Sequence, residues 1–282
     1  MLPHCPSRRR GLPWPAVLLL MILLPGPRAS AGETYSFGVV PQFEARRLAE
    51  IWGPILAEVS ARSGVTLEMA GSARIPVFEK SFQAGEFDFA YMNPYHALVA
   101  MESQGYEPLV RDGSRELFGV LVVREDSPYR EVADLAGQEI AFPAPNALGA
   151  SLLMRAELTR RFGLDFRATY AQTHTSSYMN VVLGVSAAAG GVMGTLKRQE
   201  PDVRDALRVL YETRRCPPHP VVAHPRVPAE VRAAVRAAFL ALNETETGRA
   251  LLKDVPIGEA VAASGEDYAP LRELHLEEFY VE

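Results

Sequence analysis

The sequence predicts an α/β protein of two Rossmann-like lobes that are joined by two crossing segments. After Gly32, short β-type runs alternate with longer helix-type runs, which is typical of parallel strands covered by helices. An apolar strand at 117–124 leaves the first group of elements, and a proline-rich segment at 215–222 returns to it. Two crossings make a hinge with a cleft between the lobes. The chain after residue 31, about 250 residues, suits two lobes of ordinary size.

Residues 32–118 and 222–282 are expected to build the first lobe. Its longest helix-type run, 44–62, places four aliphatic side chains on one stripe at helical spacing. Pro54 interrupts this run, so we expect a bend there or a later helix start. The stripe comprises Leu48, Ile51, Ile55 and Val59. The other elements expected in this lobe are strands at 35–40, 65–70, 87–91 and 221–223 and helices at 75–84, 96–103 and 231–242.

Residues 119–221 are expected to build the second lobe. Gly137 ends a short helix-type run, as glycine commonly does. The glycine stretch at 190–194 lacks the lysine of a P-loop and the spacing of a dinucleotide fingerprint, so it indicates close backbone packing rather than a phosphate cradle. The elements expected in this half are strands at 117–124, 139–142, 169–172 and 209–212 and helices at 132–137, 149–162 and 178–183.

Residues 1–31 have the pattern of a signal peptide. Three arginines at 8–10 precede an apolar run at 16–24, and Ala29-Ser30-Ala31 has the A-x-A form that signal peptidase cleaves. The apolar run is shorter than the roughly 20 residues that span a bilayer, which leaves an uncleaved anchor as the second alternative. Cys5 precedes the apolar run, unlike a lipoprotein attachment cysteine. We expect cleavage after Ala31 and a mature chain free in the periplasm.

Charge and cysteine content exclude some partners. Removal of residues 1–31 takes away four arginines and no acid, so the formal net charge moves from −5 to −9. An acidic surface repels phosphate backbones, so we expect no nucleic acid partner. An anionic ligand would then be held by local dipoles and donors rather than by net charge. Only Cys216 remains after cleavage, which rules out an intramolecular disulfide.

A polar segment at 173–177 is the first candidate ligand site. It lies where a strand is expected to end and a helix to begin, so backbone N–H groups and the positive end of a helix dipole point outward. Hydroxyls and an imidazole in this position suit an oxyanion. The alternative is simple helix capping by Ser176 or Thr175, with His174 on the surface. The candidate ligand residues here are His174, Thr175, Ser176 and Ser177.

A second candidate loop follows the expected strand at 87–91. Tyr91, Asn93 and Tyr95 would face the same cleft from the other lobe, where aromatic walls and an amide could pack against a ligand. The alternative makes Tyr95 a core residue and the Asn93-Pro94 pair a turn. Residues 41–43, after the first strand, are a third candidate with a weaker case.

We expect neither an enzyme nor a cofactor or metal site. No G-x-S-x-G elbow occurs in the sequence, and His174 has no carboxylate within its loop. Cys216, His219 and His224 are separated by prolines and strand residues, which argues against a metal set. A free thiol beside the cleft would still suit a soft ligand.

Five sequence segments carry a family resemblance: Phe37-Gly38-Val39-Val40, Phe87-Asp88-Phe89-Ala90-Tyr91, Pro145-Asn146, His174 and Gly190-Gly191-Val192. Taken together, they resemble the periplasmic phosphonate- and phosphate-type binding proteins that serve ABC importers. The resemblance covers nearly all of the chain after residue 31, and it implies the type II periplasmic binding protein architecture, a Venus flytrap. It also makes Asn146 a candidate ligand residue, and His174 matches the anion-binding histidine of the family.

This resemblance does not identify the ligand. Family members that hold a phosphonate use a Ser-Thr-Ser run where this chain has Ala147-Leu148-Gly149. Each missing charge-assisted donor costs about 1.5–3 kcal/mol of binding. We therefore expect a monomer that captures a small oxyanion, such as phosphate, phosphite or a phosphonate, for an ABC permease in the inner membrane. The alternative is a sensory binding protein that presents an oxyanion such as arsenite to a sensor histidine kinase.

Overall fold

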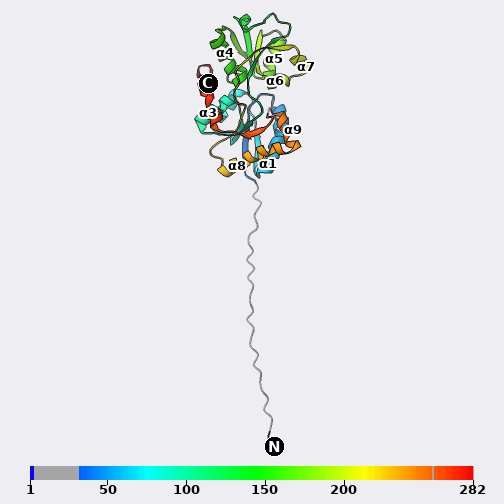
Figure 1. Cartoon of the computed structure of the whole chain (residues 1–282), viewed down its shortest axis with the longest axis vertical. Helices are drawn as coiled ribbons and strands as arrows, with labels where there is room; N and C mark the ends of the chain where they lie inside the picture. The colour runs from blue at the N-terminus through cyan, green and yellow to red at the C-terminus, as the bar shows by residue number, and fades with distance from the viewer. Residues whose placement is uncertain (3–31, 256, 282) are drawn as a thin grey trace. The chain divides into compact units, whose positions relative to one another are not determined.

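The strands of the chain form two separate sheets (Figure 1). The structure is a computed structural model that describes residues 1–2, 32–255 and 257–281, so the predicted signal peptide lies almost wholly outside the described residues. Within those ranges, no helix is long and apolar enough to cross a membrane. Residues 32–282 form one compact unit.

The first sheet has six strands in the order β11-β4-β10-β3-β1-β2. Two of them, β4 and β11, were not predicted from the sequence. The bounds are β1 Thr34–Val39, β2 Thr66–Ala70, β3 Phe89–Tyr91, β4 Glu107–Asp112, β10 Val221–Ala223 and β11 Ala260–Ala262. Strand β10 begins at Val221, one residue before the position at which the first lobe is expected to resume.

The second sheet has five strands in the order β7-β6-β8-β5-β9. Its bounds are β5 Gly119–Arg124, β6 Glu139–Phe142, β7 Arg167–Tyr170, β8 Ala188–Val192 and β9 Leu207–Glu212. Strand β6 has the predicted bounds, whereas β8 falls on the glycine stretch that the sequence indicated only as close packing.

Both sheets are mixed, although the sequence pattern predicted parallel strands. The pairs β1–β2, β1–β3, β6–β7 and β6–β8 are parallel, whereas β5 and β10 pair antiparallel with both of their neighbours. Each of these two strands directly follows a crossing segment. It therefore enters its sheet from the edge at which the parallel strands end, and it must run the opposite way.

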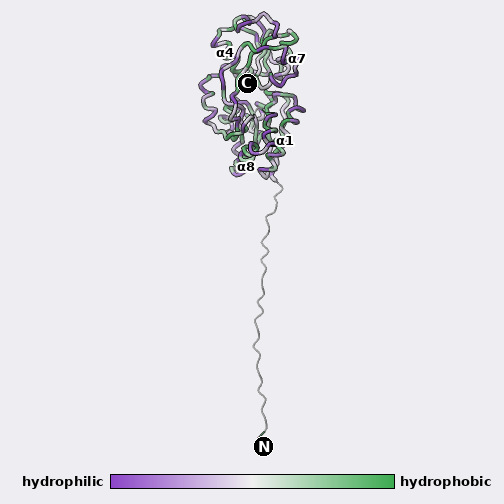
Figure 2. Tube along the Cα trace, turned by 45° about the vertical axis from the view of Figure 1, so that its right-hand side comes forward, coloured by the Kyte–Doolittle hydropathy of each residue, from purple (hydrophilic) through white to green (hydrophobic). Residues whose placement is uncertain are grey.

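Helices cover both sheets and bury apolar faces on them. Figure 1 shows α1, α8 and α9 beside the first sheet and α4 to α7 beside the second. The bounds are α1 Ala45–Ser63, α2 Ile75–Gln83, α3 Pro94–Gln104, α4 Leu153–Phe162, α5 His174–Val182, α6 Met193–Lys197, α7 Pro201–Arg204, α8 Ala229–Ala241 and α9 Glu246–Asp254. Figure 2 shows hydrophobic segments through the interior and hydrophilic ones along outer loops and helices.

Helix α1 runs through Pro54 without a later start, contrary to one of our two expectations. Gly53 and Pro54 lie on its exposed face, so the hydrogen bond that proline removes is lost at the solvent side, where water can replace it. The opposite face buries Leu48, Trp52, Ile55, Leu56 and Val59.

A π-helical turn, η2 (Leu148–Leu152), precedes α4 and packs directly on β5 and β8. A Cβ at Gly119 would lie 1.9 Å from the Gly149 carbonyl oxygen, and one at Gly190 would lie 2.0 Å from the Ala150 carbonyl oxygen. Only glycine permits this approach of backbone to backbone. The predicted packing role of the glycine stretch is thus confirmed.

The two crossing segments lie side by side. Leu117 N–H donates to the Cys216 carbonyl at 2.9 Å, and Cys216 N–H donates to the Leu117 carbonyl at 2.8 Å. These two bonds pair the segment that leaves the first sheet with the segment that returns to it. The pair of crossings therefore forms a short antiparallel ribbon between the sheets.

The C-terminal segment, which follows the last strand of the first sheet, ties back to the second sheet's side. Arg155 Nη2 donates to the Phe279 carbonyl at 2.6 Å, and Arg160 Nη1 donates to the Leu274 carbonyl at 2.8 Å. Asn146 Nδ2 donates to the Val281 carbonyl at 2.7 Å, and Val281 N–H donates back to Asn146 Oδ1 at 2.9 Å. This tail is a third connection between the two halves, which the sequence did not predict.

Candidate functional site

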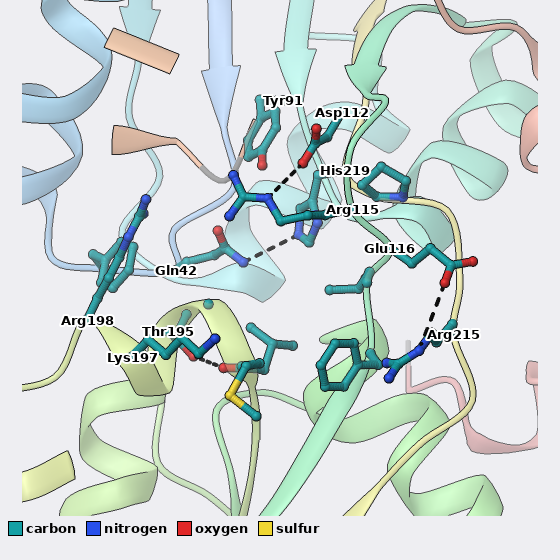
Figure 3. Close-up of a pocket in the computed structure, with 17 residues that line it drawn as sticks. Gln42, Tyr91, Asp112, Arg115, Glu116, Thr195, Lys197, Arg198, Arg215 and His219 are labelled. Atoms are coloured by element: carbon teal, nitrogen blue, oxygen red, sulfur yellow. Dashed lines mark hydrogen bonds and ion pairs between the residues drawn. The ribbon is translucent and has the colours of Figure 1, made fainter. Parts of the chain in front are cut away.

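A cavity of about 290 Å³ lies between the two sheets, and elements of both supply its walls (Figure 3). From the first half come the loop after β1, the end of β3 and part of the second crossing. From the second half come the end of β8 and α6, and the first crossing contributes Leu117 and Phe118. The lining residues are Gln42, Phe43, Tyr91, Asp112, Arg115, Glu116, Leu117, Phe118, Val192, Met193, Gly194, Thr195, Lys197, Arg198, Arg215, Pro218 and His219.

The charged side chains of this cavity are mostly cationic. Four basic residues line it, Arg115, Lys197, Arg198 and Arg215, against two carboxylates. One carboxylate, that of Asp112, is buried, and its oxygens are hydrogen-bonded within the protein. It accepts bonds from Arg115 Nε, from Ser114 and from the backbone N–H groups of residues 258 and 259. The cavity therefore has an excess of positive charge, which favours an anion.

Gln42 and Tyr91 of the first half and His219 of the second crossing form a connected polar wall. His219 lies 3.3 Å from the Gln42 amide nitrogen, and its ring stacks on Tyr91 at 5.3 Å between centroids. Burial lowers the pKa of His219 to about 3, and nearby His96 and His174 add to that shift. The imidazole is therefore neutral at pH 7 and is able to donate or accept one hydrogen bond.

A much smaller cavity, of about 20 Å³, adjoins the large one and shares Gln42, Leu117, Val192 and His219 with it. This volume holds about one water molecule. Asn93, His174 and the start of η2 contribute to its wall. Their position corresponds to the strand-to-helix junctions that the sequence singled out, but the space left between them is too small for a phosphonate.

His174 is buried rather than on the surface. Its Nδ1 lies 3.1 Å from Thr195 Oγ1, which in turn bonds Tyr178 and the Val192 carbonyl. Burial lowers the pKa of His174 to about 4, so the ring is neutral at pH 7. The contact orients Thr195, whose residue lines the large cavity.

The hydroxyl residues beside His174 serve the helix. Helix α5 begins at His174, four residues before the predicted start, and Thr173 is its N-cap, accepting from Ser176 N–H at 3.0 Å. Ser177 Oγ donates to the Thr173 carbonyl at 3.1 Å. Thr175 is exposed. Among these residues, His174 lines a described cavity, and Thr175, Ser176 and Ser177 do not.

The remaining candidate ligand residues, Tyr91, Asn93, Tyr95 and Asn146, also differ in whether they line the large cavity. Tyr91 lines the large cavity, and burial raises its pKa far above the ordinary range. Asn93 caps α3 by accepting from His96 N–H, and it donates to the Asn146 carbonyl at 3.1 Å. Tyr95 packs in a core cluster and contacts the Tyr280 ring. Asn146 is fully buried in the tie to the C-terminal segment.

The four cationic residues of the large cavity were not predicted from the sequence. The predicted ligand donors follow strands at strand-to-helix junctions, whereas Arg115 precedes the first crossing, Arg215 begins the second, and Lys197 and Arg198 lie at the end of α6. Charged residues on the crossing segments themselves were the available signal. The third candidate loop, 41–43, does contribute Gln42 and Phe43 to the cavity.

The described residues offer no metal centre and no reactive thiol. No group of three or more His, Cys, Asp and Glu side chains in the described ranges is placed to hold a metal ion. Cys216 is buried, and burial raises the pKa of its thiol to about 12. The thiol therefore stays protonated, which disfavours the soft ligand considered from the sequence.

Comparison with known proteins identifies the family. Residues 37–268 match the family model described as ABC transporter, phosphonate, periplasmic substrate-binding protein. The chain belongs to this family. A curated member, the phosphonates-binding periplasmic protein of Escherichia coli K12, is 20% identical over 272 residues, which cover 92% of this chain and 80% of that protein.

Solved structures of this family share the fold. A binding protein component of an ABC phosphonate transporter from Pseudomonas aeruginosa aligns with a TM-score of 0.80 at 17% identity, over 86% of each chain. A Prochlorococcus marinus protein solved with methylphosphonate aligns with a TM-score of 0.79 at 14% identity, over 88% of this chain and 99% of that one. The predicted type II periplasmic binding protein fold is confirmed.

Proposed function

We propose that this chain captures an oxyanion of the phosphonate class between its two lobes and delivers it to an ABC permease in the inner membrane. The lobes are residues 32–118 with 222–282 and residues 119–221, and residues 1–31 direct export to the periplasm. Family membership supports the transporter partner. The observation that carries the ligand proposal is the cavity between the sheets, which is lined by four cationic side chains and only two carboxylates.

Closure is the proposed mechanism. The loop after β1, β3 and the second crossing supply one wall, while β8 and α6 supply the other, so a bound ligand touches both lobes and stabilises the shut form. Of the residues that the sequence singled out, Tyr91 and His174 act at this site, together with Gln42, Thr195 and His219. No covalent step is part of the proposal.

A ligand panel tests this function. The chain beginning at Gly32 is titrated with phosphate, phosphite, methylphosphonate, sulfate and arsenite, and unfolding is followed by thermal shift. A ligand at a hundredfold excess over its Kd stabilises the folded state by about 2.7 kcal/mol. We expect a phosphonate to raise the unfolding temperature and sulfate to have a smaller effect. The absence of a response to every anion would refute the proposed function.

A further inference from the structure

Four buried polar residues form a closed ring of hydrogen bonds between the two halves. One oxygen of the Glu79 carboxylate lies 2.8 Å from His96 Nε2, and the other accepts from Asn146 Nδ2 at 3.2 Å. Asn93 Nδ2 donates to the Asn146 carbonyl at 3.1 Å, and Asn93 Oδ1 accepts from the His96 N–H at 2.8 Å. Each of the four residues is at most 6% exposed. The ring is therefore shielded from water.

The ring crosses from one half to the other and lies outside the large cavity. Glu79 belongs to α2, His96 belongs to α3 and Asn93 caps α3, all in the first half. Asn146 follows β6 of the second half. None of the four residues lines the large cavity, and Asn93 lines the small one. The ring therefore joins the halves rather than contacting a ligand in the large cavity.

The bonds of Glu79 fix a direction more than they add stability. The His96 ring packs against Phe78 and Phe82, at 6.1 and 5.3 Å between centroids, and its Nδ1 has no hydrogen-bond partner among the described residues. Well-packed apolar residues are often at least as stable as a buried pair of this kind. Each carboxylate oxygen has its partner in a different half, however, so a displacement of Asn146 leaves a buried acceptor unpaired.

Apolar packing holds α3 to both halves beside the crossings. Ala97 and Ala100 of this helix lie in the core of the first sheet, whereas Tyr95 and Leu98 pack in a second cluster with residues of η2 and α4. The second cluster also contains Cys216, one partner of the paired crossings. The ring and the crossings therefore belong to the same side of the molecule.

The contacts between the halves on the far side of the large cavity are exposed. Arg198 Nη2 donates to the Lys253 carbonyl at 2.6 Å, near the end of α9, and Arg47 Nη2 lies 3.5 Å from the Arg198 carbonyl. Figure 3 shows Arg198 on one side of the cavity and the Arg215–Glu116 pair, which adjoins the crossings, on the other. Water can replace exposed bonds of this kind, so the Arg198 side, here called the mouth, separates at lower cost than the ring.

We propose that the contact between Glu79 and Asn146 is a fixed pivot beside the crossings. The lobes open and close by rotation with this contact intact, while the contacts of Arg198 at the mouth separate. The inference rests on the proposed closure and adds the residues that fix its axis. Glu79 is a positioning residue in this account, because it acts through Asn146 and does not line the large cavity.

Distances between spin labels test the pivot. Two cysteine pairs are introduced at exposed positions of the chain that follows residue 31: Lys80→Cys with Thr159→Cys, in α2 and α4 beside the pivot, and Asp202→Cys with Glu246→Cys, in α7 and α9 across the mouth. Cys216 is buried and its thiol stays protonated, so the introduced cysteines are the ones that react.

Electron–electron double resonance is recorded without ligand, with saturating methylphosphonate and with saturating inorganic phosphate. We expect a ligand that binds to shorten the distance of the mouth pair by more than about 2 Å, the scale of a hinge closure, and to change the pivot pair by less than that.

Substitution of Glu79 separates a pivot from passive packing. Glu79→Leu removes both acceptors, so the distances of the pivot pair should broaden without ligand and shift with ligand by more than about 2 Å. Asn146→Ala removes the other partner and should have the same effect. Glu79→Gln, which keeps an acceptor for Asn146, should behave as the parent chain does, and so should Glu86→Leu, the control at an exposed position after α2. Circular dichroism verifies that each variant folds.

Two outcomes would overturn the inference while the proposed function stands: a pivot pair that shifts with ligand as much as the mouth pair, or Glu79→Leu and Asn146→Ala variants that keep the parent distances at the pivot. A mouth pair that responds to neither anion would instead contradict the proposed function. The broadening of the pivot distances in ligand-free Glu79→Leu, or its absence, would then still decide for or against the pivot.

Discussion

His174 begins a helix of the second lobe and His219 lies on the second crossing segment, and both are buried and neutral. Burial lowers the pKa of His174 to about 4 and that of His219 to about 3, against an ordinary value of 6.5. In the unfolded chain both rings take up a proton below pH 6.5, whereas in the folded chain they do not. Their contribution to stability is therefore complete above pH 6.5 and is lost as the pH falls toward 4.

We expect the unfolding temperature of the ligand-free chain to fall between pH 6.5 and 4. Each histidine contributes a slope of about 1.4 kcal/mol per pH unit in this range. A His174→Gln, His219→Gln double variant should show a flatter profile in thermal melts, whereas His275→Asn, at an exposed position, should keep the steep one. Identical slopes in the double variant and the parent chain would contradict this account.

His174 also determines how Thr195 presents its hydroxyl to the large cavity. His174→Ala removes the ring that lies 3.1 Å from Thr195 Oγ1, so we expect the affinity for the responding oxyanion to fall about tenfold. Thr175→Ala, one residue along on the exposed face of α5, is the control and should bind as the parent chain does. Titration calorimetry measures both, and equal affinities would place the ligand away from this wall.

At the scale of elements, the glycines decide how closely η2 approaches the second sheet. Gly119→Ala would place a Cβ 1.9 Å from the Gly149 carbonyl oxygen, a backbone atom that cannot rotate away. We expect a loss of about 1–3 kcal/mol in the free energy of unfolding, measured by urea denaturation.

Gly53→Ala is the opposite case. No atom lies within 4 Å of a Cβ at Gly53, in the exposed face of α1, so alanine should stabilise the helix by about 0.5–1 kcal/mol. Equal effects of the two substitutions would show that the close approach of η2 does not constrain Gly119.

The alternation of short apolar runs and amphipathic runs predicted most of these elements, because strands and helices leave distinct periods in the sequence. The bounds of β6 were predicted without error, and η2 with α4 covers almost the predicted 149–162. Strands β4 and β11 were not predicted, since β4 carries charged residues and a proline and β11 has only three residues, so the burial of both depends on a partner strand. The start of α5 was misplaced because its first turn is made of hydroxyl residues.

At the scale of the whole molecule, the candidate site was only partly predictable. Tyr91, Asn93 and His174 contribute to the cavities as the strand-to-helix pattern suggested, whereas Tyr95 and Asn146 pack elsewhere. A local pattern indicates that a residue follows a strand. It does not indicate which side chains the opposite lobe brings across the cleft. The four cationic residues of the large cavity therefore could not be predicted from one segment at a time.

The C-terminal tie makes a further prediction at this scale. Asn146 bonds Val281 on both its amide atoms and donates to Glu79 Oε2 at 3.2 Å, so Asn146→Ala should lower the free energy of unfolding by about 1–3 kcal/mol. It should also increase the radius of gyration of the ligand-free chain in small-angle scattering. A variant of unchanged stability that no longer binds an oxyanion would instead assign Asn146 to the ligand.

The ribbon formed by the two crossings belongs both to the proposed hinge and to the cavity walls. Leu117 belongs both to the paired backbone of the proposed hinge and to the wall of each cavity, and His219 follows three residues after the other hinge partner, Cys216. A substitution that reshapes the pocket for another guest will thus also alter the stiffness of the joint. In such a molecule selectivity and the rate of opening change together, and neither can be adjusted independently along this stretch of chain.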